Sequence, residues 1–228
     1  MQHRRGMRLG LALGLSGLTL AGNSGFARPV FPWPDTFLAR LEALALMQSL
    51  NANLLAARSA TATLDQWCAD HKLASDPKIH ARLVRGAEKP VSIEQRARLR
   101  IDMDEPVKYR RVELTCGDVI LSEADNWYVP SRLTKEMNQI LETTDTPFGR
   151  AVQDLQPFRR TFSVEIFWKP LPEGWEMNAL PPEDHAERAL AIPEKLFQHR
   201  ALVLREDQKP FSEVTETYTS AVLGFGQP

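Results

Sequence analysis

The clearest alternation of hydrophobic and polar positions lies in the first half of Lys108–Pro130. It runs through Arg111, Val112, Glu113, Leu114, Thr115 and Cys116. A period of two is typical of a strand with one buried face. Gly117-Asp118 is a turn signal, and Val119–Val129 is a second β-rich run that ends at Pro130. Two such runs around a glycine-containing turn predict an antiparallel hairpin.

Arg111 lies at the start of this hairpin, on the face opposite Val112 and Leu114. A guanidinium there lies either in solvent or in a polar cavity, where its planar fork of donors suits a carboxylate. The local pattern favours solvent, because arginine side chains are mostly exposed.

Helical periodicity is strongest in Asp35–Arg58, where a broad apolar stripe follows Asp35 as a candidate cap. Thr61 or Thr63 is expected to cap a shorter helix over Leu64–His71. Three further helices are predicted: Ser131–Leu141, a short one from Ala151 to Pro157, and Glu183–Leu190.

Further strands are predicted at Ile79–Val84, Phe162–Trp168, Arg200–Arg205 and Pro210–Leu223. Charged residues recur at every second position of Arg96–Met103, which predicts an edge strand or a flap. Because strands follow one another in groups with helices between or outside them, the expected fold class is α+β. The expected architecture is a single antiparallel β-sheet covered by helices.

The first residues have the composition of a targeting segment. Three arginines, Arg4, Arg5 and Arg8, precede the apolar run Leu9–Ala21, and Gly25-Phe26-Ala27 offers small residues for cleavage. We expect residues 1–27 to be a signal peptide and the protein to be periplasmic or secreted. An uncleaved membrane anchor is the alternative, although the run is short for a span. Residues 28–58 then form a proline-rich linker and the first helix, and residues 59–228 form the main domain.

The 228 residues carry a formal net charge of −1, so nothing in the overall charge suggests a polyanion partner, and no nucleic-acid partner is expected. We also expect no stable membrane insertion once the leader is removed. The chain has two cysteines, Cys68 and Cys116. In an exported protein such a pair could be oxidised to a disulfide. The alternative is that Cys116, on the apolar face of its strand, is simply a small buried residue.

Motifs for phosphate loops and metal centres are missing from the sequence. It contains no glycine-rich phosphate loop, HExxH or CxxC. The histidines His71, His80, His185 and His199 have no metal-ligand spacing, so no metal is expected and each is read as a surface residue.

Several short segments, in order along the chain, resemble the chorismate pyruvate-lyase family. They are Ser59-Ala60-Thr61, Arg111–Cys116 with Trp127–Pro130, Thr146–Arg150, Arg160–Phe162 and Lys209-Pro210 with Thr215-Glu216. The resemblance implies a chorismate lyase-like fold and a cofactor-free elimination of pyruvate from chorismate, which leaves 4-hydroxybenzoate. It implies a monomer whose partner is a small aromatic or cyclohexadiene carboxylic acid.

Carried over residue by residue, the resemblance assigns catalysis to Arg111 and Glu216. Arg111 matches the arginine that holds the carboxylate, and Phe148 matches a residue that binds through its backbone N–H. Ala60 stands where the family has a methionine in the wall of the site. Glu213 is the rival of Glu216, because an extra residue is needed to align the last strand, and strand parity favours Glu216 inside. The same fold occurs in non-catalytic ligand-binding domains of transcription regulators, so an exported binder of an aromatic acid is the second hypothesis.

Overall fold

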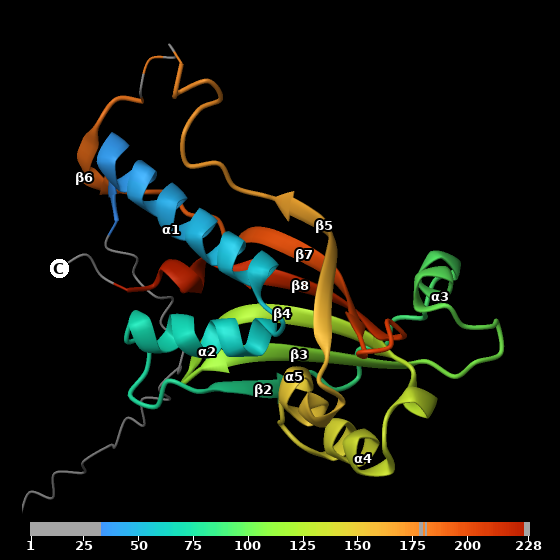
Figure 1. Ribbon diagram of the computed structural model, residues 1–228. Helices are drawn as coiled ribbons and strands as arrows, with labels where there is room; N and C mark the ends of the chain where they lie inside the picture. The colour runs from blue at the N-terminus through green and yellow to red at the C-terminus, as the bar shows by residue number, and fades with distance from the viewer. Residues whose placement is uncertain (1–32, 178–179, 181, 226–228) are drawn as a thin grey trace, which may run out of the picture.

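A six-stranded antiparallel sheet is the centre of the protein (Figure 1). The computed structural model describes residues 33–225, apart from 178–179 and 181. The strand order is β2-β3-β4-β8-β7-β5. The bounds are β2 Ile79–Leu83, β3 Lys108–Cys116, β4 Val119–Tyr128, β5 Phe158–Ile166, β7 Lys195–Leu204 and β8 Pro210–Thr219. A separate two-stranded sheet pairs β1 (Pro34–Asp35) with β6 (His185–Ala189).

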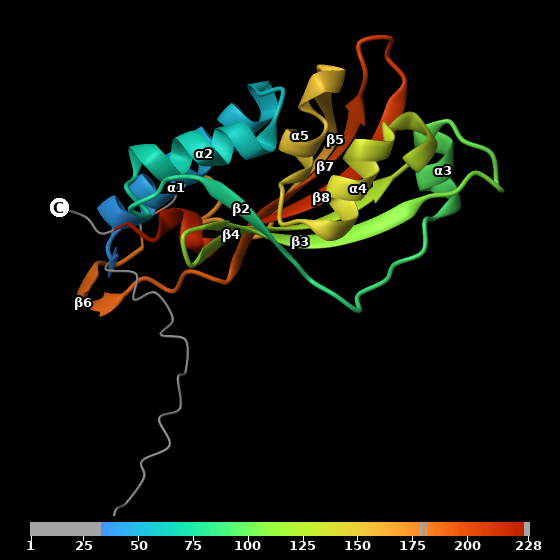
Figure 2. The ribbon, with the colours of Figure 1, turned by 90° about the horizontal axis from the view of Figure 1, so that it is seen from below.

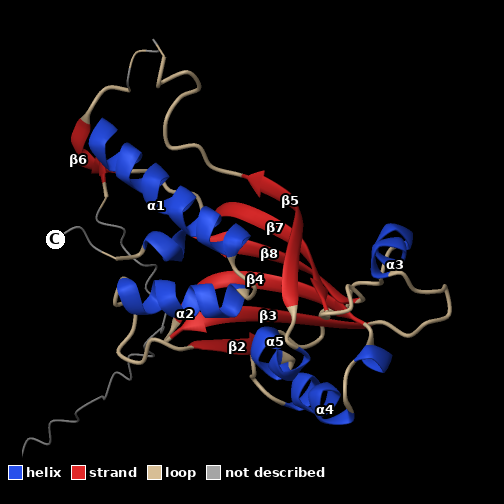
Figure 3. Ribbon diagram, in the orientation of Figure 1, coloured by secondary structure: helices blue, strands red, loops and turns tan. Residues whose placement is uncertain are grey.

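Most of the helices lie on one face of the six-stranded sheet, which we call the inner face (Figure 2). The long helix α1 (Phe37–Ala56) and α2 (Ala60–Asp70) cross it side by side. Two short helices, α4 (Lys135–Thr143) and α5 (Phe148–Ala151), lie next to the β2–β3 end, and α3 (Ile93–Leu99) lies apart from the others (Figure 3). Single 3₁₀ turns occur at Pro130–Arg132, Gln153–Leu155 and Ser220–Leu223.

In helix α1 the buried apolar residues recur every three or four positions and so lie on one side of the helix. Its buried residues are Ala39, Ala43, Met47, Leu50 and Leu54, which form one stripe against the inner face. The helix begins one residue later than predicted. Thr36, and not Asp35, is the cap, with its hydroxyl accepting from the Ala39 N–H. Asp35 instead forms an ion pair with Arg40.

The predicted fold class is confirmed. The predicted hairpin is β3 and β4, which are second and third in the sheet, and β8 pairs with β4 on the other side. Within residues 33–225, no described helix is long and apolar enough to cross a membrane. The predicted signal peptide, residues 1–27, lies outside the described residues.

Two element predictions are wrong. Arg96–Met103 is not a strand: its first half, up to Leu99, belongs to α3, because Ser92 and Gln95 form a reciprocal capping box that starts a helix. The alternating charges were misleading in so short a segment. The predicted helix at Glu183–Leu190 is instead strand β6, whose backbone pairs with β1.

Cys68 and Cys116 form a disulfide that joins α2 to the end of β3, with 6.2 Å between their Cα atoms. Both residues are fully buried. The link holds α2 against the sheet, close to the cavity described next.

Candidate ligand-binding cavity

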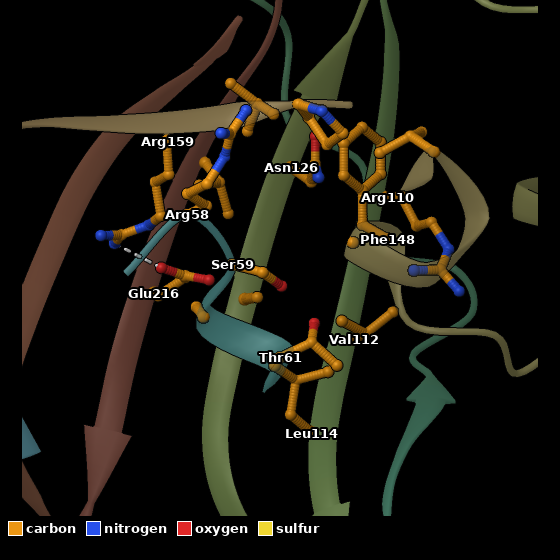
Figure 4. A pocket seen from close by; sticks show the side chains of 17 residues that line it. Arg58, Ser59, Thr61, Arg110, Val112, Leu114, Asn126, Phe148, Arg159 and Glu216 are labelled. Carbon is orange, nitrogen blue, oxygen red and sulfur yellow. Dashed lines mark hydrogen bonds and ion pairs between the residues drawn. The ribbon is translucent and has the colours of Figure 1, made fainter. Parts of the chain in front are cut away.

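A cavity lies between the inner face of the sheet and the first turns of α2 and α5 (Figure 4). Its volume is about 60 Å³, measured as the space open to the centre of a water molecule. Much of its wall is apolar, formed by Val112, Leu114, Ala124, Phe148, Val203 and Val214. Its charged residues are Arg58, Arg110, Arg159 and Glu216. An apolar wall with a few converging polar groups is the usual make-up of a small-molecule site.

Glu216 and Arg159 form a buried ion pair in this wall. Arg159 Nη2 donates to Glu216 Oε2 at 2.6 Å, and the two side chains are 4% and 8% exposed respectively. Burial opposes the charge on Arg159, but Glu216 raises the pKa of Arg159 above its ordinary value. The Tyr218 hydroxyl donates to the same carboxylate oxygen at 3.2 Å. Burial and then Glu216 raise the pKa of Tyr218, so this hydroxyl keeps its proton.

His199 contacts the Arg159 guanidinium of this ion pair. Its Nδ1 lies 3.4 Å from Arg159 Nη2, and its Nε2 lies 2.7 Å from Asn51 Oδ1 on α1. Because a guanidinium only donates, Nδ1 accepts and Nε2 carries the hydrogen. Burial, followed by the charge of Arg159, lowers the pKa of His199 to about 4, so the ring is neutral near pH 7. The prediction of a surface histidine at this position is wrong, since His199 is fully buried.

Two residues that line the cavity, Arg159 and Asn126, have N–H groups for which no acceptor is found among the described residues. Arg159 Nε is buried and, among the described residues, has no hydrogen-bond partner. Asn126 is buried too, and its Oδ1 accepts from Ser212, which leaves its amide N–H₂ free to donate. Helix α2 starts at the cavity, with Ser59 as its cap and Ala60 and Thr61 in the cavity wall. The first N–H groups of a helix have no partner within it and favour anions.

Arg111 does not line the cavity, and this placement corrects the one implied by the family resemblance. Its guanidinium lies on the opposite face of β3, 3.3 Å from Glu123 and 3.8 Å from Asp125. The reason is the two-residue period of a strand: the residue that shares a face with Val112 is Arg110. That arginine is in the cavity wall.

Arg110 holds the loop before α5 in place. Its Nε donates to the Leu141 carbonyl at 3.0 Å, and its Nη2 donates to the carbonyls of Thr144 and Thr146 at 3.3 and 2.9 Å. Figure 4 shows its guanidinium turned away from Glu216. Burial lowers the pKa of Arg110, and the carbonyl oxygens stabilise its charge. This arginine therefore positions Phe148 through the preceding loop.

The other residues that the sequence singled out lie close together. Ala60, Phe148 and Glu216 all line the cavity. Phe148 is the first residue of α5, where helix geometry supplies no acceptor for its N–H. The predicted parity of β8 is confirmed: Glu213 points to the other face, where Arg98 binds its carboxylate through two bonds of 2.7 and 2.9 Å. The roles of Ala60, Phe148 and Glu216 in binding or catalysis stay predictions.

The helices that form the cavity are fastened to each other. Arg150 of α5 makes two 2.7 Å bonds to the carboxylate of Asp65 on α2, and it donates to the Ile79 carbonyl of β2. The two helices approach closely at Gly149, where an added Cβ would lie 3.0 Å from Ser59 Oγ and 3.2 Å from Thr61 Oγ1. A larger residue at this position would therefore push the two hydroxyl groups aside.

Sequence reasoning missed Arg159, Asn126 and Arg58. The signal for Asn126 was available, because it lies two residues after Ala124 on the same face of β4. Arg159 lies outside the Arg160–Phe162 match, in the part of β5 that the prediction omitted. Within the described residues, no group of three or more histidines, cysteines or carboxylates is placed to hold a metal ion.

Comparison with known proteins gives one strong match. The chain is 51% identical over 197 residues to the uncharacterized protein y4mC from Sinorhizobium fredii, an alignment that covers 86% of this chain and 83% of that protein. The chain belongs to the y4mC family. Since y4mC is itself uncharacterized, membership in the y4mC family assigns no activity. No protein-family model matches the chain.

Solved structures give only distant matches. The effector domain of PhnF from Mycobacterium smegmatis matches with 14% identity and a TM-score of 0.43, over 63% of this chain and 82% of that one. A GntR-family transcriptional regulator from Enterococcus faecalis matches with 11% identity and a TM-score of 0.39, over 62% and 94%. YydK from Bacillus subtilis matches with 16% identity and a TM-score of 0.38, over 61% of this chain and 58% of that one. At these scores the matches carry no conclusion about ligand or activity.

Proposed function

We propose that this chain binds a small organic anion, of the class of ring-bearing carboxylic acids, in the cavity between α2, α5 and the sheet. The observation that carries the proposal is the buried donor set. Arg159 Nε is buried and has no acceptor among the described residues. The Asn126 amide nitrogen can donate as well, because its Oδ1 already accepts from Ser212. Unmatched buried donors are costly, and a carboxylate that accepts from them would remove that cost.

The charge and shape of the cavity agree with such a ligand. Three arginines and one glutamate line it, so a single negative charge is favoured there. The apolar side chains of Val112, Val214 and Phe148 suit the face or edge of a ring. A neighbouring depression of about 500 Å³ shares Arg58, Ser59, Thr61, Gly149 and Pro157 with the cavity, so the two lie side by side.

Isothermal titration with 4-hydroxybenzoate, benzoate and the neutral analogue benzyl alcohol tests the proposal. The two acids should bind and the alcohol should not. Asn126→Leu removes one donor and should weaken binding by about tenfold or more, the effect of losing a buried hydrogen bond to a charged group. Arg58→Met, at the edge of the cavity, should also weaken it. Arg111→Met is the matched control, because this arginine lies on the other face of the same hairpin. Equal binding of acid and alcohol, or a loss of binding in Arg111→Met alone, would contradict the proposal.

Catalysis is the second candidate, favoured by the placement of Glu216, Phe148 and Ala60 in one cavity wall. We propose that any reaction would be an elimination of the chorismate lyase type, with Glu216 as the carboxylate nearest the ligand. Binding has the better support, because the Glu216 carboxylate is already held by the Arg159 guanidinium at 2.6 Å and by the Tyr218 hydroxyl. Incubation with chorismate and an assay for released pyruvate decides between the two. Release that Glu216→Gln abolishes would establish the lyase, and binding without release would leave the binder.

We also propose that the chain is exported and loses its first 27 residues. The sequence of the leader motivates this, and a disulfide between Cys68 and Cys116 is typical of oxidising compartments. Intact-mass analysis of protein from the periplasm should give a chain that begins near Arg28. Full-length protein in the cytosol would refute export.

A further inference from the structure

Strand β5 is one of the two edge strands of the six-stranded sheet, and β2 is the other. It pairs with β7 on one side, and no described strand pairs with its other side. Figure 1 shows it at the front of the molecule, crossing in front of the other strands. An edge strand offers a row of unpaired N–H and C=O groups to another strand.

This edge carries exposed apolar side chains. Phe162 and Val164 are each 41% exposed, and Phe167, just after the strand, is 42% exposed. Other large hydrophobic residues are more exposed, but these three lie within six positions of each other along one edge of the sheet. Apolar residues gathered at an unpaired edge indicate a contact with another chain.

The faces of β5 follow from its register. Val164 lies opposite His199, and Thr161 lies opposite Ala201, so both belong to the inner face with Glu216 and Val214. Arg160 lies opposite Leu202 and Glu165 opposite Gln198, which places both on the outer face. A bulge between Thr161 and Ser163 allows these two charged residues, five positions apart, to share a face.

The strand is complementary to itself in this register. A two-fold axis between Phe162 and Ser163 would place Arg160 opposite Glu165 of a second copy and Thr161 opposite its Val164. Each pair then lies on one face, and the charges attract in both halves of the ribbon. Arg160 and Glu165 are exposed, and no ion pair involves either of them within the described residues. A second copy of this chain would therefore form ion pairs with Arg160 and Glu165 and hydrogen bonds with the unpaired backbone groups of β5.

We propose that two copies of this chain associate through antiparallel pairing of their β5 strands, in the register that joins Arg160 of each copy to Glu165 of the other. The inference is independent of the cavity's ligand, and it replaces the monomer expected from the family resemblance. Because Arg159 precedes Arg160 on the same strand and points to the cavity, the pairing also braces the strand that carries the buried ion pair.

Charge reversal tests the register directly. Molar mass is measured by light scattering and by sedimentation over roughly a hundredfold range of concentration, since dimers dissociate on dilution. The wild-type chain should be a dimer. Arg160→Glu alone and Glu165→Arg alone should each weaken association by tenfold or more, because like charges then lie opposite each other. The double variant Arg160→Glu/Glu165→Arg restores opposite charges and should restore the dimer.

The control is Glu206→Arg in the turn between β7 and β8, an exposed charge reversal away from β5 that should leave the dimer intact. Circular dichroism of each variant reports whether it is folded. A wild-type monomer at every concentration would overturn the proposal. A dimer that neither single variant weakens would overturn it too, as would a double variant that stays monomeric.

Discussion

The disulfide between Cys68 and Cys116 gives the sharpest prediction for stability. It joins α2 to the end of β3, and 48 positions separate the two cysteines. Opening the bond leaves the folded contacts of α2 in place but frees the unfolded chain. The expected effect is therefore on the free energy of unfolding and not on the fold itself.

The magnitude follows from the length of the closed loop. For a separation of 48 residues, the loop-closure entropy corresponds to about 4 kcal/mol at 25 °C. This value is comparable with the whole free energy of unfolding of many single domains. The reduced protein should thus unfold at a much lower concentration of denaturant.

Urea unfolding of the wild-type chain, with and without a thiol reductant, measures this difference. The double variant Cys68→Ala/Cys116→Ala should match the reduced protein or be slightly less stable, because it also loses two buried sulfur atoms. It should not respond to reductant, which makes it the control for unrelated effects of the reagent. If reduction changes the free energy of unfolding by less than about 1 kcal/mol, the loop-closure reasoning is wrong for this protein.

Three further predictions concern the cavity. Glu216→Gln leaves Arg159 buried without an opposite charge and should lower the free energy of unfolding by about 3 kcal/mol, measured in urea. Gly149→Ala should lower the free energy of unfolding by about 1–3 kcal/mol and weaken ligand binding, because the added Cβ would press against Ser59. Urea unfolding measures the first effect and isothermal titration the second. The pKa of His199 is about 4 in the folded protein, against an ordinary value of 6.5 for an exposed histidine. As the pH drops from 6.5 towards 4, the unfolded chain therefore takes up this proton while the folded protein does not, and the free energy of unfolding should fall. His199→Phe should flatten that part of a pH–stability curve, and an unchanged slope would contradict the assignment.

The sheet was predictable from the sequence because its strands obey a two-residue period. Leu114 and Val214 alternate with polar neighbours, so the faces of β3 and β8 could be assigned before any contact was known. Helix α3 could not, because it has only seven residues and its capping box at Ser92 competes with an accidental alternation of charge. Strand β6 is held by backbone pairing with β1, which no local pattern in its exposed residues reveals.

Only part of the cavity wall could be predicted from the sequence, because the resemblance assigned the wrong residue of β3 to it. Motif matching placed Arg111 in the site because it stands next to Val112 in a familiar order of residue types. Strand geometry excludes this, since neighbours in a strand point to opposite faces and only Arg110 shares the inner face. In the structure Arg110 donates to three carbonyl oxygens of the chain, whereas the guanidinium beside Glu216 belongs to Arg159 on the edge strand β5. A ligand's carboxylate would therefore meet a different arginine, from a different strand, than the resemblance implies. This is why Arg111→Met serves as a control for binding and not as a test of it.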